Sequence, residues 1–108
     1  MLNVKKLLAK IIPSIQTLND WKTGYFGLAN ASGASFNHPN GLTSYLLVTG
    51  HNSTPALNGI WFIRAGGSNA FKLCGGGNVT VTVTSTKVTV KTTAGAVGVS
   101  YIPMQMPL

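Results

Sequence analysis

The side chains able to carry acid–base, nucleophilic or metal chemistry are few in this chain. One side-chain carboxylate, Asp20, accompanies two histidines, His38 and His51, and one cysteine, Cys74. Glycoside hydrolysis needs two carboxyl groups, and a Ser-His-Asp arrangement would have to recruit Asp20. No close metal-ligand spacing links the histidines to Cys74, which leaves a ring of histidines on a symmetry axis as the alternative route to a metal. The sequence predicts no catalytic residue, no metal and no cofactor.

Cys74 is followed by three glycines, a pattern that invites comparison with a phosphate-binding loop. That loop ends in Gly-Lys-Ser/Thr and leads into a helix, because backbone N–H groups and the lysine cradle the phosphates. Here residues 75–77 lead into alternating valines and threonines instead. We therefore expect a flexible turn after a buried cysteine.

Two polar loops have the composition of a glycan site. Flat aromatic rings cover the apolar face of a sugar, while amides and imidazoles bond its hydroxyls. The first loop lies around residues 37–41 and the second around 51–54, with Trp61 near the second. The competing interpretation is that Phe36 and Trp61 fill the protein core. The predicted ligand-binding residues are Phe36, Asn37, His38, Asn40, His51 and Asn52.

The elements that must position these loops are β-strands. Residues 79–84 and 87–92 alternate valine with threonine or lysine, a period of two that lines one face with valine and the other with polar groups. Further strands are expected at 25–29, 44–49, 59–64, 71–73 and 97–102, separated by Gly/Asn/Pro turns. We predict a jelly-roll-like antiparallel β-sandwich over residues 21–108. The expected core is Leu46, Val48, Ile60, Phe62, Val79, Val81, Val83, Val88, Val90, Val99 and Tyr101.

Residues 1–20 are a different kind of sequence, with apolar residues at alternating spacings of three and four. That heptad pattern predicts a short amphipathic helix for oligomerisation or attachment. β-branched residues at its d positions favour three or more strands, so we predict a homotrimer. A helix lying on a membrane through Lys5, Lys6 and Lys10, a helix packed on its own domain, and a signal peptide are the alternatives. The predicted oligomerisation residues are Val4, Leu8, Ile11, Ile15 and Leu18.

The net charge is positive, but charged residues are few. Eight Lys/Arg against one acid give +7, yet charged residues make up only 8% of 108 residues. A positive balance favours anionic partners, but the lysines are concentrated at the N-terminus or scattered. Nucleic-acid binding would need basic residues interleaved with aromatics on one surface. The closest approach to this pattern is Arg64 near Trp61 and Phe62, with Lys72 beside Phe71. Nucleic acid is therefore not an expected partner.

Two segments resemble bacteriophage tail-fibre and related fibre-tip proteins. They are the leader 4–10, Val-Lys-Lys-Leu-Leu-Ala-Lys, and residues 45–55, which read as a strand followed by a polar loop. The resemblance implies a non-enzymatic homotrimer on a virion or extracellular particle, with other particle proteins and a host-surface glycan as partners. A chain that stays in the host cytoplasm is the alternative localisation. The alternative functions are sequestering a small anionic ligand through Arg64, Lys72 or Lys91, and binding a membrane surface as an oligomeric β protein.

Overall fold

The computed structural model describes residues 23–104. The predicted N-terminal helix and all five oligomerisation residues lie outside these residues. Eight strands and one short 3-10 helix, η1, make up the described chain. They are β1 (Gly24–Ala29), β2 (Ala34–Asn37), β3 (Ser44–Gly50), η1 (Pro55–Leu57), β4 (Gly59–Arg64), β5 (Ala70–Gly75), β6 (Val79–Val83), β7 (Lys87–Thr92) and β8 (Val97–Pro103).

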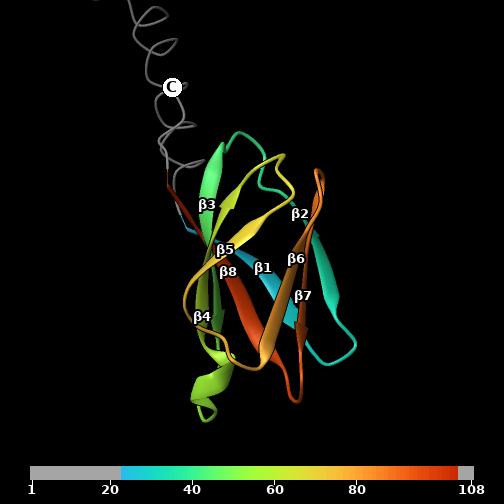
Figure 1. Ribbon diagram of the computed structural model, residues 1–108, viewed down its shortest axis with the longest axis vertical. Coiled ribbons are helices and arrows are strands. Elements are labelled where there is room, and N and C mark those ends of the chain that lie inside the picture. Colours follow the sequence, from blue (N-terminus) through green and yellow to red (C-terminus); the bar gives the residue numbers. More distant parts are fainter. Residues whose placement is uncertain (1–22, 105–108) are drawn as a thin grey trace, which may run out of the picture.

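These strands form two antiparallel sheets that face each other (Figure 1). The larger sheet has the order β1-β8-β3-β4-β5, and the smaller has the order β2-β7-β6. The prediction of a mainly β domain with antiparallel strands is confirmed, and each of the seven expected strands is present. The strand that the prediction omitted is β2, whose four residues offer too few alternations to be recognised.

The smaller sheet has one buried and one polar face, as its alternation predicts. Val83, Val88 and Val90 are buried, while the threonines between them point outward. On the outer face Ser35 Oγ and Thr89 Oγ1 are hydrogen-bonded at 2.8 Å. Val99 of the larger sheet is also buried, and Val79, Val81 and Tyr101 pack against the core from its margin. The predicted core is confirmed for these residues.

The predicted core is wrong in β3 and β4, where the opposite face points inward. The buried side chains are Tyr45, Leu47 and Thr49 in β3 and Trp61 and Ile63 in β4, whereas Leu46, Val48, Ile60 and Phe62 lie half-buried on the outer face. Both strands are apolar at successive positions, so their alternation does not say which face is buried, and a one-residue shift reverses every side chain. Burying the large aromatic rings of Tyr45 and Trp61 removes more apolar surface from water.

Because successive strands run in opposite directions, the loops lie at two ends of the domain, as Figure 1 shows. The proximal end holds the first and last described residues, Thr23 and Met104, together with loops 38–43, 65–69 and 84–86. The distal end holds loops 30–33, 51–58, 76–78 and 93–96. The two loops predicted to bind a ligand therefore lie at opposite ends.

The glycines after Cys74 are explained by Trp61. Its ring lies between Gly59 and Gly76, and a Cβ at Gly59 would be 2.6 Å from Trp61 Cη2. Gly76 has φ +67° and is buried, so an added Cβ there would be strained and would collide with the same ring. The segment is thus a turn, as expected, but it is packed against Trp61, whereas the sequence predicted a flexible one. The expectation of a buried cysteine is wrong, because Cys74 is exposed on the edge strand β5.

Gly76→Ala should therefore lower stability while Gly77→Ala should not. The first change combines a left-handed backbone with overpacking against Trp61, an expected cost of about 2–4 kcal/mol. Gly77 has open space within 4 Å of the position that a methyl group would occupy and no positive φ, so it is a matched control one residue away. Urea unfolding followed by Trp fluorescence measures both. Equal midpoints for the two variants would contradict the packing role.

Candidate functional site

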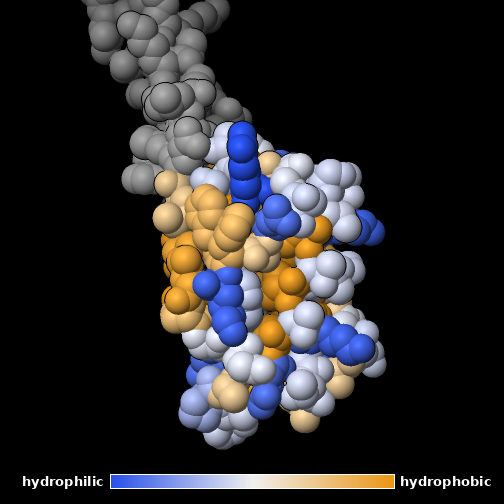
Figure 2. Space-filling model, viewed as in Figure 1, coloured by the Kyte–Doolittle hydropathy of each residue, from blue (hydrophilic) through white to orange (hydrophobic). Residues whose placement is uncertain are grey.

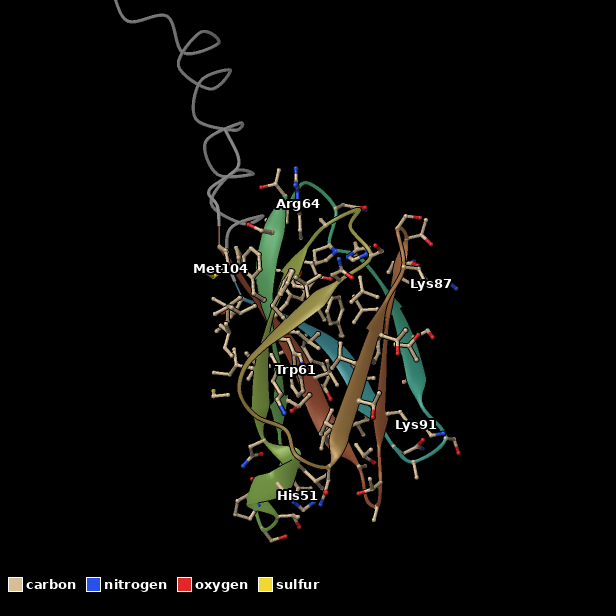
Figure 3. The ribbon with its side chains drawn as sticks, viewed as in Figure 1. His51, Trp61, Arg64, Lys87, Lys91 and Met104 are labelled. Carbon is tan, nitrogen blue, oxygen red and sulfur yellow. The ribbon has the colours of Figure 1, made fainter. Side chains whose placement is uncertain are left out.

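The residues predicted to bind a ligand do not form one site. Asn37, His38 and Asn40 lie at the proximal end, near Thr23, where residues 1–22 join the domain. His51 and Asn52 lie at the distal end, and Figure 3 shows His51 there, far from Arg64, Lys87 and Met104.

Phe36 has a packing role in the structure. Its ring stacks on that of Phe26 at a centroid distance of 5.2 Å and an interplanar angle of 13°. Phe26 also contacts the rings of Tyr45 and Tyr101, so Phe36 extends an aromatic cluster between the two sheets. Trp61 is buried in the core, and Phe36 packs half-buried against the core, so the core interpretation describes both rings better than an open sugar platform does.

His38 joins three parts of the proximal end. Its Nε2 lies 2.8 Å from the carbonyl oxygen of Thr84, and its Nδ1 lies 2.7 Å from the hydroxyl of Tyr45. A carbonyl only accepts, so Nε2 is the donor, and the neutral ring then accepts the Tyr45 hydroxyl proton at Nδ1. Tyr45 is fully buried, and this burial raises the pKa of its hydroxyl well above the usual range. His38 thus satisfies a buried polar group, and both of its ring nitrogens are occupied.

The distal loop 51–58 is organised by its own side chains. His51 Nδ1 accepts the backbone N–H groups of Ser53 and Thr54 at 3.2 and 3.1 Å. The backbone N–H of His51 donates to Asn58 Oδ1. Below the loop, Leu57 is buried and its carbonyl accepts a 2.9 Å hydrogen bond from the buried Thr49 hydroxyl. His51 therefore shapes the loop through Nδ1, and no hydrogen bond within residues 23–104 uses its Nε2.

Backbone hydrogen bonds join the four distal loops into one surface. Gly76 N donates to Asn58 O at 2.7 Å, and Asn78 N donates to Ala56 O at 3.0 Å. Thr93 N donates to Asn78 O, and Thr92 N donates to Asn30 O. We call this composite the distal surface, defined by His51, Asn52, Ser53, Asn58, Asn78 and Asn30.

The amides of the distal surface divide into two kinds. Asn30 Oδ1 accepts Ser32 N–H and Asn58 Oδ1 accepts His51 N–H, so these two hold loops. Asn52 and Asn78 are exposed, and within residues 23–104 their side-chain amides have no hydrogen bond. Sequence reasoning missed Asn78, although its place directly after the glycine turn marked it as a loop amide.

The positive charges of residues 23–104 do not converge. Arg64 and Lys87 lie at the proximal end, whereas Lys91 lies on β7 towards the distal end (Figure 3). Lys72 is on the edge strand β5. Within the described range 23–104, no group of three or more His, Cys, Asp or Glu side chains could hold a metal ion. No helix in that range is long and apolar enough to span a membrane.

Comparisons with protein-family models, with curated proteins and with solved structures found no match to this chain.

Replacing His38 with Ala should destabilise the domain by about 1–3 kcal/mol, because the buried Tyr45 hydroxyl loses its acceptor. A double-mutant cycle with Tyr45→Phe isolates this effect: in the Tyr45→Phe background, His38→Ala should cost less. Chemical denaturation of the four proteins measures the coupling. A coupling energy of zero would mean that the His38–Tyr45 contact contributes nothing to stability.

Tyr45 also predicts an alkaline limit to stability. Its pKa is raised in the fold, so above pH 10, the ordinary tyrosine value, the unfolded chain releases this proton first and folding loses free energy. The loss should reach about 1.4 kcal/mol per pH unit. Tyr45→Phe should show a shallower fall over the same range when unfolding is measured between pH 9 and 11. Parallel slopes for the two proteins would refute the assignment.

Proposed function

We propose that this chain is a non-enzymatic receptor-binding module of a phage or phage-derived particle, similar to fibre-tip proteins. In this proposal a helix within residues 1–20 attaches and trimerises a jelly-roll-like sandwich of residues 21–108. The partners are two further copies, other particle proteins and a host-surface ligand with the chemistry of a glycan. The location is the virion or an extracellular particle.

The distal surface is the observation that carries the proposal. It lies at the end of the domain away from Thr23, so a helix that attaches the chain leaves it uncovered. Its loops are seated on a rigid two-sheet scaffold, which is the usual arrangement for recognition. The predicted residues at this end are His51 and Asn52, and we include Asn78 with them because it is exposed and its loop is bonded to loop 51–58.

The chemistry of this surface suits a neutral, hydroxyl-rich ligand. Asn52 and Asn78 present exposed amides that both donate and accept, and His51 adds the Nε2 edge of its ring. No lysine or arginine belongs to loops 30–33, 51–58, 76–78 or 93–96. Polar contacts without a stacking ring make each site weak, so useful affinity requires several copies acting together.

Asn37, His38 and Asn40 are less suited to this role. They lie at the proximal end, and His38 uses both ring nitrogens inside the domain. Sequestering a small anion is supported less still, because Arg64, Lys72 and Lys91 lie on different strands at different places. Membrane binding through Lys5, Lys6 and Lys10 concerns residues outside the described range.

The proposal predicts that Asn52→Ala/Asn78→Ala abolishes glycan binding without unfolding the domain. Losing two amide contacts at about 1 kcal/mol each weakens one site roughly 30-fold, and avidity multiplies the loss. A glycan array probed with wild-type and variant protein provides the measurement. The matched control is Asn40→Ala/Asn69→Ala, which removes two exposed amides from the proximal end. Loss of binding in the control but not in the distal variant would place recognition at the wrong end for this proposal.

A further inference from the structure

The outer face of the five-stranded sheet is apolar, which is unusual for a surface that faces water. The side chains at its margins are well exposed: Tyr25 63%, Leu28 67%, Phe71 58%, Leu73 60%, Ile102 40% and Met104 49%. Leu46, Val48, Ile60 and Phe62 lie between them, half-buried. Figure 2 shows hydrophobic side chains gathered along the left side of the molecule, where the strands of the five-stranded sheet lie. The three-stranded sheet instead presents threonine, serine and lysine.

Strand register makes these side chains a continuous surface. Ile102, Leu46, Phe62 and Phe71 are opposite one another across β8, β3, β4 and β5. The next row contains Tyr25, Ser100, Val48, Ile60 and Cys74, across all five strands. We call these two rows the apolar face. Neither row contains a lysine, arginine or acid, and an uncharged apolar surface of this kind marks an interaction site.

We infer that the apolar face is the interface between copies of this chain, with three such faces directed at a common three-fold axis. This inference rests on the proposed homotrimer and deepens it. The occupant of each face is the same face of the two neighbouring copies. β3 is the middle strand of the sheet, so Leu46 and Val48 would lie nearest the axis.

The place where the N-terminal segment joins the domain supports this occupant. Residues 1–22 lead directly into β1, an edge strand of the same sheet, and Gly24 lies at the proximal end of that strand. The heptad stripe ends at Leu18, and the five residues 19–23 span at most about 17 Å. Three chains joined through residues 1–18 would therefore hold their five-stranded sheets close together, with all distal surfaces at the opposite end.

Charge is compatible with this arrangement. Copies that each carry a formal +7 repel one another, and the two rows of the apolar face contain no lysine or arginine. The exposed Arg64 lies one row beyond Phe62, at the proximal margin of the same sheet face. Four strand spacings by the four residues that two rows occupy give a flat area of about 260 Å² per copy. That is well below the roughly 800 Å² per partner of a stable interface, so the face needs residues 1–18 to act with it.

Charged substitutions on the apolar face test the inference in the full-length chain. Light scattering at micromolar concentration should give wild-type protein three times the chain mass of 11.3 kDa. Leu46→Lys/Phe62→Lys should give the mass of one chain with an unchanged β-sheet circular-dichroism spectrum. Thr82→Lys, an exposed outward position on β6, is the matched control and should remain trimeric. A trimeric lysine double variant, or a monomeric wild type, overturns the inference.

A cysteine probe keeps the test valid even where the lysines prevent folding. In a Cys74→Ser background, Val48→Cys should form disulfide-linked dimers on mild oxidation, whereas Thr82→Cys should not. Equal cross-linking at the two positions also overturns the inference. A third outcome also overturns the inference: the wild type is monomeric, and deleting residues 1–18 speeds alkylation of the thiol introduced by Val48→Cys. That outcome would identify the chain's own N-terminal segment as the occupant of the apolar face.

Glycan-array binding of the same proteins separates this inference from the proposed function. If the protein is a trimer that binds no glycan, the interface stands and the proposed recognition role is refuted. If it is a monomer that binds glycan through the distal surface, the recognition role stands and the interface is refuted.

Discussion

The inward orientation of Tyr45 and Trp61 is the constraint on which the rest of the structure depends. These two rings lie on adjacent strands of the larger sheet, and their burial decides which face of β3 and β4 meets the smaller sheet. Trp61 requires glycine at two positions beside it, which shapes the turn that leads from β5 to β6. Tyr45 requires an acceptor for its hydroxyl, which ties the loop after β2 to the turn between β6 and β7. The same orientation leaves leucine, valine, isoleucine and phenylalanine facing outward.

Much of this fold follows from sequence, and the exceptions have physical causes. The Val/Thr alternation of β6 and β7 has one polar face, so it predicts both the strands and their buried side. β3 and β4 have apolar residues on both faces, so periodicity predicts the strands without saying which face is buried. The burial of Thr49 could not be read from composition either, since its hydroxyl is satisfied by a carbonyl eight residues along the chain.

The candidate site was only partly accessible from sequence. Polar loop composition marked both loop 38–43 and loop 51–58, but their separation depends on strand direction and topology, which composition does not encode. The imidazole of His38 and that of His51 stand in similar Asn/Pro-rich surroundings in the sequence, yet one bonds a buried phenol and the other caps its own loop. Asn78 joins the distal surface through a backbone bond to a residue 22 positions earlier.

The hydrogen bonds that join the distal loops run between main-chain atoms, while the side chains of His51, Asn58 and Asn30 each hold their own loop. A main-chain hydrogen bond does not depend on the identity of the side chain. Positions 52, 53 and 78 can therefore accept other residues while the loops keep their places, whereas positions 30, 51, 58 and 76 are constrained. The distal surface therefore combines variable side-chain positions with a fixed main-chain frame, so single substitutions at positions 52, 53 or 78 could change the chemistry of this surface while the fold is retained.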